Sequence, residues 1–438
     1  MVDIYDQNLP KSSIFKMNIY KQVVALFKGN VLHALSQVLV IFLLSYFGGS
    51  LAAGNYVLAL SVTAPVFLFF DLNLRVVRAT DQSHDSTFWT YIQLRVLANI
   101  LSVITVVALS VFYFDMNLIL LFFVVVYRVG ESISNLAYGA MQRVQGGQMV
   151  GRSLGMKGVI TIALVGVALP VFSGNPVVAA SIMAAISLFW ALFRDMPRAL
   201  EFSSINSGIN WLSDFSKNWE LLKIVRLAKQ SFPLGLDAGI SSLALNAPKY
   251  FIEVWLGTES LGVFGLLWQL AYSLQKLVGA MGHAGVSMLS KYRHDNMRQK
   301  FWKLLNQLIM YTFFIGIAVV ILGSLILPVL LERLLGEQYA HVSLVFALLL
   351  SSALAGLLRI TGRASQACGK FKAYTWLDVL LLVVSIVSCW FFVQSYGLLG
   401  AAIALCISFS VTLVATFIYT YVFLWSSTCD VKSKLAEY

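Results

Sequence analysis

Long apolar runs follow one another along the chain, and polar residues are largely confined to the short stretches between them. An α-helix rises about 1.5 Å per residue, so about 20 consecutive apolar residues cross the hydrocarbon core of a bilayer. The pattern therefore predicts twelve membrane-spanning helices. Their expected cores are residues 30–47, 52–70, 91–113, 117–138, 156–172, 176–194, 233–255, 260–286, 304–328, 341–360, 377–395 and 398–424.

Composition agrees with this pattern. The chain is 59% hydrophobic and 12% charged, whereas a soluble domain is roughly 45–50% apolar and about 25% charged. We therefore expect an all-α integral membrane protein. Its net charge of +11 does not indicate nucleic-acid binding, because basic residues in membrane proteins gather in cytoplasmic loops that face anionic lipid.

The distribution of basic residues predicts the orientation. Four lie inside spans, at Arg95, Arg128, Lys249 and Lys276, and Arg333 alone lies in a connection on one side. The rest of the 31 Lys and Arg residues fall in the termini, in the connections of the opposite side or at the span ends next to them. Since basic loops stay in the cytoplasm, both termini are expected there.

A long connection at residues 195–232 divides the spans into two sets of six. Trp211, Phe215, Trp219 and Leu222 recur in it at helical spacing between basic residues, which predicts an amphipathic helix on the inner leaflet; a solvated linker is the alternative. The expected divisions are a cytoplasmic amphipathic N-terminal segment (1–29), a first six-helix bundle (30–194), the amphipathic linker (195–232), a second six-helix bundle (233–424) and a cytoplasmic tail (425–438).

The two sets of spans show weak internal similarity. "AASIMAAIS" (179–187) matches "GAAIALCIS" (400–408), and "FGGSLAAGNY" (47–56) resembles "LGTESLGVF" (256–264). An even number of spans in each half makes such repeats parallel, related by an axis along the membrane normal. This predicts two six-helix bundles around a central cavity.

The sequence carries no enzyme motif. GxxxxGK[ST], HExxH and GxSxG are all absent, and the connections on the non-cytoplasmic side are too short to build a catalytic site. The four cysteines, Cys368, Cys389, Cys406 and Cys429, lack metal-ligand spacing and are expected to be free thiols. We predict no enzymatic activity, cofactor or metal.

Ionisable residues inside the spans are the candidates for function, because a charge at mid-bilayer costs about 2.5–3.5 kcal/mol on insertion scales. Arg128 and Glu131 are expected to lie on one helix face, as are Lys249 and Glu253. Lys276 has no nearby acid in its span. Structural alternatives are an internally neutralised Arg128–Glu131 pair and outward snorkelling of Lys249 and Glu253.

Taken together, the cations of both halves predict a positive cavity suited to an anionic cargo such as a lipid pyrophosphate. The candidate substrate-binding residues are Arg128, Lys249 and Lys276, and the candidate coupling or pairing groups are Glu131, Asp237, Glu253 and His283. Arg95 is expected to snorkel toward the cytoplasm.

Three stretches resemble the polysaccharide branch of the multidrug/oligosaccharidyl-lipid/polysaccharide (MOP) flippase superfamily, particularly Wzx-type O-antigen flippases. "FPLGLDAGISSLALNAPKYFIEVWLGTESLGVFGLLWQL" (232–270) is similar to the family's seventh and eighth helices. "LLERLLGEQYAHVSLVFALLL" (330–350) and "SYGLLGAAIALCISF" (395–409) resemble its ninth-to-tenth and eleventh-to-twelfth corners. One departure is Pro248, which stands before Lys249 where many relatives carry an acid.

The resemblance implies a flippase that moves undecaprenyl-diphosphate-linked oligosaccharide across a bacterial inner membrane by alternating access, with possible ion coupling. It implies the lipid-linked oligosaccharide and membrane lipids as partners, with a polysaccharide polymerase and chain-length machinery as candidates. The alternatives are a multidrug-type small-molecule antiporter, a membrane polysaccharide polymerase or ligase, and a scaffold without transport. An antiporter of organic cations would favour acids in its cavity, whereas cations match or outnumber acids in these spans.

Overall fold

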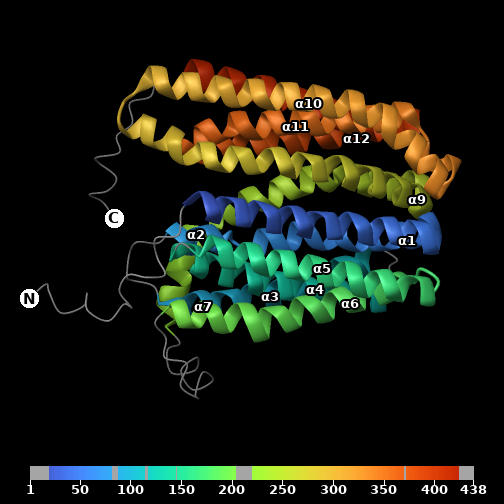
Figure 1. Ribbon diagram of the computed structural model, residues 1–438, viewed down its shortest axis with the longest axis horizontal. Coiled ribbons are helices and arrows are strands. Elements are labelled where there is room, and N and C mark those ends of the chain that lie inside the picture. The colour runs from blue at the N-terminus through green and yellow to red at the C-terminus, as the bar shows by residue number, and fades with distance from the viewer. Residues whose placement is uncertain are drawn as a thin grey trace, which may run out of the picture.

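The computed structural model describes residues 19–80, 87–113, 117–144, 146–203, 220–368 and 371–423. The regular elements within these ranges are all helical (Figure 1). Residues 1–18, 204–219 and 424–438 lie outside the described part, and with them Trp211, Phe215, Trp219 and Cys429.

Helices of the first half begin with α1 (Ile19–Phe70) and the short α2 (Leu74–Thr80). They continue as α3 (Phe88–Tyr113), α4 (Leu118–Arg143), α5 (Gly147–Val171), α6 (Pro176–Trp190), the π-helical turn η1 (Ala191–Asp195) and α7 (Met196–Phe202). The second half contains α9 (Leu221–His294), α10 (Arg298–Leu335), the 3₁₀ turn η2 (Glu337–Tyr339), α11 (Val342–Ala367), α12 (Phe371–Ile418) and the π-helical turn η3 (Tyr419–Phe423).

Three of these helices double back. In the described ranges, nine helices are long and apolar enough to cross a membrane, but α9 alone has 74 residues and would extend about 110 Å if straight. It is interrupted at Gly257, as α1 is at Gly49 and α12 at Gly397, and each of these glycines has a positive φ. The three reversals turn the nine long helices into the twelve predicted spans.

The twelve spans form two bundles, as expected. Helix α1 of the first bundle lies next to α9 of the second (Figure 1). Gly49 (φ 77°, ψ −178°) and Gly257 (φ 82°, ψ 172°) have nearly the same backbone conformation at equivalent corners of the two halves. Only glycine adopts this conformation without strain. The shared corner supports the internal repeat.

These two corners pack against each other reciprocally. A methyl group on Gly54 would overlap with the carbonyl oxygen of Thr258, and one on Gly262 would overlap with that of Ser50. The absence of a Cβ at both glycines therefore lets the backbones of the two bundles touch at the end remote from the chain termini.

At this remote end the two bundles share one hydrophobic core. It includes Leu44 and Tyr56 from α1, Phe264 from α9 and Tyr339 from η2. Toward the end where the described chain begins and finishes, one cluster lies around Tyr91 of the first bundle and includes Leu227 from the start of α9, and another lies around Phe301 of the second bundle. The bundles therefore share a core at the remote end, and α1 also packs on α9 toward the terminal end, where a methyl group on Gly235 would overlap with the carbonyl oxygen of Phe69.

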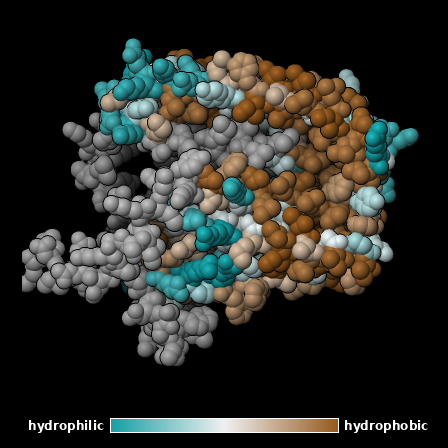
Figure 2. Space-filling model, viewed as in Figure 1, coloured by the Kyte–Doolittle hydropathy of each residue, from teal (hydrophilic) through white to brown (hydrophobic). Residues whose placement is uncertain are grey.

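The surface fits a bilayer. A broad hydrophobic area covers much of the face in Figure 2, with hydrophilic residues toward the left side and the far right edge. Val167, Leu325 and Phe391 are among the apolar side chains exposed on the helices. Lipid would cover them.

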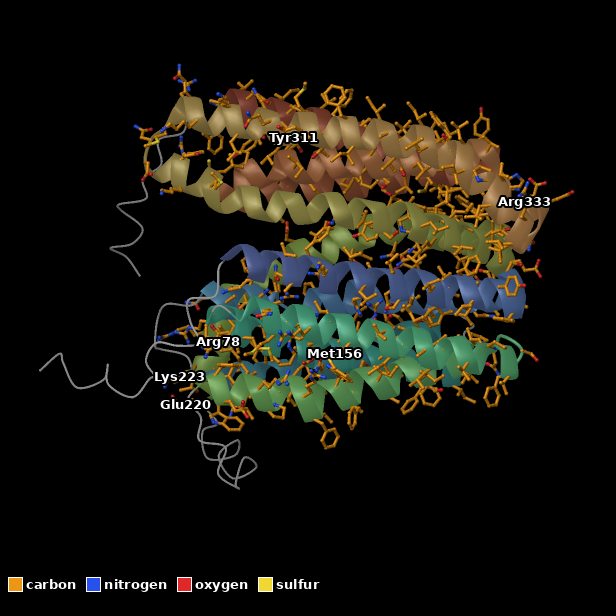
Figure 3. The ribbon with its side chains drawn as sticks, viewed as in Figure 1. Arg78, Met156, Glu220, Lys223, Tyr311 and Arg333 are labelled. Carbon is orange, nitrogen blue, oxygen red and sulfur yellow. The ribbon has the colours of Figure 1, made fainter. Side chains whose placement is uncertain are left out.

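Polar residues at the two ends follow the predicted asymmetry. Arg333 lies at the end remote from the termini, whereas Arg78, Glu220 and Lys223 lie near the opposite end (Figure 3). Helix α1 already begins at Ile19, and Gly29 packs directly on Gly151 of α5. Where the N-terminal segment ends and the first span begins remains a prediction.

Candidate substrate site between the bundles

Side chains from both bundles converge on one turn of α1, midway along its second span. Arg128 of α4 donates from Nη2 to the carbonyl oxygen of Leu60 (3.0 Å) and from Nε to Oγ1 of Thr63 (3.3 Å). Tyr250 of α9 donates its hydroxyl to the carbonyl oxygen of Ser61 (2.6 Å). This turn of α1 is therefore the meeting point of α4 and α9.

Arg128 has no acidic partner here. Its guanidinium is half-buried and contacts the ring of Tyr127. Among the described residues no carboxylate lies within ion-pair distance of it. The expected Arg128–Glu131 pair is therefore wrong, because Glu131 turns toward α5 instead.

Lys249 is the matching cation of the second bundle. Its Nζ donates to Oδ1 of Asn246 (2.9 Å), and the amide of Asn246 is anchored on the carbonyl oxygen of Ser242 (2.8 Å). Glu253 accepts a hydrogen bond from the Thr258 hydroxyl (2.7 Å), and no ion pair joins it to Lys249 although the two lie on one helix face. In the described part of the chain, no carboxylate lies within ion-pair distance of Lys249.

Arg128 donates to Leu60 of α1, and Tyr250, the residue after Lys249, donates to Ser61. Arg128 and Lys249 therefore lie at the same turn of α1, and their positive charges act on each other. One belongs to each bundle, and both are partly exposed. Two such cations, held apart from carboxylates but near each other, have the charge and the donors that an anion with more than one negative charge requires.

Glu131 belongs to a separate buried cluster inside the first bundle. Nζ of Lys157 lies 2.9 Å from Oε1 of Glu131, 2.9 Å from Oγ of Ser134 and 3.8 Å from Oδ2 of Asp195. His33 of α1 approaches the other Glu131 oxygen at 3.9 Å. The cluster ties α1, α4, α5 and η1 together.

Sequence analysis missed Lys157 and Asp195 as members of this cluster. Lys157 stands at the edge of a predicted span among basic and glycine residues and was assigned to the cytoplasmic side. Helix α5 in fact begins at Gly147, which carries Lys157 into the bundle. The available signal was spacing, since Ser153 and Lys157 lie four residues apart on one helix face and both contact Asp195.

Asp237 has a partner that the sequence did not indicate. Its carboxyl group forms side-chain hydrogen bonds with Thr375 and Asp378 of α12. A hydrogen bond between two carboxyl groups requires a proton on one of them. Arg359 of α11 interacts electrostatically with Asp378, so an acid pair and a cation adjoin inside the second bundle.

Arg359 also meets an aromatic pair. It donates to the Tyr272 hydroxyl (2.7 Å) and lies over the Tyr272 ring. Tyr272 stacks on Trp268 with ring centroids 5.5 Å apart. Arg359 was assigned to the cytoplasmic side from its position near the end of a predicted span, but it lies well inside α11.

Three further expectations concern single residues. The side chains of Lys276 and His283 lie outside the described part of the chain, so both remain predictions. Arg95 does not snorkel: it is 1% exposed, forms an ion pair with Asp71 and donates to Ser132 (3.1 Å). Its burial is possible because Asp71 supplies the compensating charge.

Comparison with known proteins gives relatives of one kind. No family model matches the chain. It is 25% identical over 402 residues to a capsular polysaccharide biosynthesis protein, CapF, of Staphylococcus aureus, covering 90% of this chain and 97% of the relative. It is 26% identical over 167 residues to a putative O-antigen transporter of Shigella flexneri, covering 38% and 39% respectively.

Solved structures show the same fold at low identity. Outward-facing and inward-facing forms of a multidrug resistance MATE family transporter match with TM-scores of 0.65 and 0.64, each at 17% identity and covering 93% of this chain and 95% of that one. A MOP superfamily transporter from Pyrococcus furiosus, described as having a binding pocket of reverse polarity, matches with a TM-score of 0.62 at 16% identity over 93% and 95% of the chains.

The fold is that of MOP superfamily membrane transporters, with twelve spans in two bundles. The chain is thus a multi-pass membrane protein. Its curated relatives confirm the resemblance to Wzx-type flippases of the polysaccharide branch.

Proposed function

We propose that this protein is a flippase for lipid-linked oligosaccharide and that Arg128 and Lys249 bind the diphosphate of its cargo. The observation that carries the proposal is the juxtaposition of these two cations, one from each bundle, without carboxylate partners in the described part of the chain. A diphosphate supplies the negative charge that such a pair lacks. Arg359, which donates to Tyr272, is a further cation inside the second bundle, and Lys276 stays a prediction from the sequence.

The similarity to CapF and to the putative O-antigen transporter supports a polysaccharide precursor as cargo. The similarity to MATE transporters supports the fold alone, and the P. furiosus transporter indicates that pocket polarity varies on this fold. No enzymatic step is needed, because the lipid crosses the membrane unchanged. A polysaccharide polymerase and chain-length machinery are the partners proposed from the resemblance.

Orientation follows from the basic residues. We place the protein in a bacterial inner membrane with both termini in the cytoplasm. The core that both bundles share at the remote end then supports an inward-facing state. This is the state expected to accept cargo made in the cytoplasm.

For ion coupling, Asp237 is the best placed of the candidate groups. Its interaction with the carboxyl group of Asp378 requires a proton on one of the two acids. By contrast, Glu131 forms an ion pair with Lys157, and Glu253 accepts a hydrogen bond from Thr258. Protonation of the acid pair would change the charge that faces Arg359.

The proposal is tested in the source bacterium by deleting the gene and restoring it as variants. Arg128→Ala and Lys249→Ala should each reduce surface polysaccharide at least about tenfold, since a charged hydrogen bond contributes roughly 1.5–3 kcal/mol. Lys223→Ala is the matched control, because Lys223 is exposed near the terminal end and pairs only with Glu220. Surface polysaccharide is measured at equal protein levels, and normal amounts in both site variants would contradict the proposal.

A further inference from the structure

We propose that Tyr250 is a positioning residue: its hydroxyl latches the second bundle onto α1 and thereby holds Lys249 beside Arg128. The anion-binding role of the two cations rests on the proposed function. The latch itself rests on one hydrogen bond between the bundles and on a proline that makes it possible.

Pro65 lies inside α1. A residue at this position would normally donate its N–H to the carbonyl oxygen of Ser61, four residues earlier, but proline has no N–H. A buried carbonyl without a donor costs about 1–3 kcal/mol. The Ser61 carbonyl therefore needs a donor from elsewhere, and Tyr250 supplies it at 2.6 Å.

The second bundle contains the same arrangement within itself. Pro248 interrupts α9 and leaves the carbonyl oxygen of Ala244 without its usual partner. The hydroxyl of Ser385 on α12 donates to that oxygen at 3.0 Å. At both prolines, a hydroxyl from another helix thus donates to the freed carbonyl. The Tyr250 hydrogen bond joins the two bundles, whereas the Ser385 hydrogen bond lies within the second bundle.

The position of the latch gives it a consequence for the site. Tyr250 follows Lys249 directly in α9 and donates to the Ser61 carbonyl of α1. The carbonyl of the preceding residue, Leu60, accepts from Arg128. The two hydrogen bonds fix both cations relative to the same turn of α1. Because the cations repel each other, contacts between the bundles must hold them together in the unloaded protein, and the latch is the contact at the turn of α1 to which Arg128 also binds. A preformed site binds its anion without first bringing two like charges together.

The test is a double-mutant cycle in the full-length protein. Tyr250→Phe removes only the hydroxyl, and Pro65→Ala restores the N–H that satisfies Ser61 within α1. Ser385→Ala is the matched control, since it removes a hydroxyl from a proline-freed carbonyl inside one bundle. A thermal unfolding scan of each purified variant confirms that it is folded.

Two measurements are made on each variant. The first is the distance between spin labels at Leu118→Cys and Val342→Cys, exposed positions on different bundles at the remote end, in a background without the native cysteines. The second is the dissociation constant for farnesyl diphosphate, a simple prenyl diphosphate. Tyr250→Phe should broaden the distances toward separated bundles and weaken binding about three- to tenfold, the range of one hydrogen bond.

In the Pro65→Ala background, Tyr250→Phe should change neither quantity further, and Ser385→Ala should leave the distances as in the parent. The latch is contradicted if Tyr250→Phe leaves the label distances of the parent unchanged. It is also contradicted if Tyr250→Phe changes these distances equally in the parent and in the Pro65→Ala variant. The distances do not depend on a ligand. A parent protein that binds no prenyl diphosphate would therefore count against the proposed function while the distances still decide the latch.

Discussion

At the residue scale, several charged side chains inside the bundles, such as Arg128 and Glu131, find their partners on neighbouring helices and not on their own. Arg128 and Lys249 were predicted from their depth in the spans, and both belong to the candidate site. Glu131 was assigned to Arg128 because the two lie on one helix face, yet Lys157 of α5 holds it. Partners across helices depend on which helices become neighbours, and that information is absent from the spacing along one helix.

The Lys157 cluster leads to a stability prediction. Lys157 is 2% exposed and Asp195 fully buried, so Lys157→Met leaves two carboxylates without their cation. Breaking a buried ion pair in this way costs about 3–5 kcal/mol. We expect a markedly lower unfolding temperature in detergent, partly restored by adding Glu131→Gln and Asp195→Asn. An unchanged unfolding temperature for Lys157→Met would show that the cluster does not stabilise the fold.

At the element scale, hydropathy was sufficient to predict the spans. Glycine corners reverse the chain between the two spans of α1, of α9 and of α12. The start of α5 was predicted at residue 156, whereas the helix begins at Gly147. Hydropathy alone places the boundary too late there, because glycine and polar residues fill its first turns. Those turns are packed against α1, where Gly151 lies on Ala25 and Gly29.

Close packing of α5 on α1 gives a matched pair of substitutions. A Cβ at Gly151 would overlap with the backbone of Ala25, whereas a Cβ at Gly166 of the same helix meets nothing within 4 Å. Gly151→Ala should lower the unfolding temperature, because the helices must move apart. Gly166→Ala should leave it unchanged or raise it slightly, since alanine favours the helix by up to about 1 kcal/mol. Equal effects of the two substitutions would contradict the packing.

At the scale of the whole molecule, the two bundles touch through glycine corners and a shared core at the remote end, and α1 also packs on Gly235 of α9 toward the terminal end. This arrangement places Arg128 and Lys249 at the junction, where one anion can contact both bundles. The two-bundle architecture was predictable from span number and weak repeats. Which end is closed was not, because it depends on contacts between segments about two hundred residues apart, such as Ser50 with Gly262.

The most direct test of the account is transport by the purified protein in liposomes, measured as movement of a fluorescent oligosaccharide carried on a polyprenyl diphosphate from one leaflet to the other. The account predicts transport by the parent, a rate at least about tenfold lower for Arg128→Ala and Lys249→Ala, and a smaller loss for Arg128→Lys, which keeps the charge. A parent protein that moves no lipid-linked oligosaccharide, or alanine variants that move it at the parent's rate, would contradict the account.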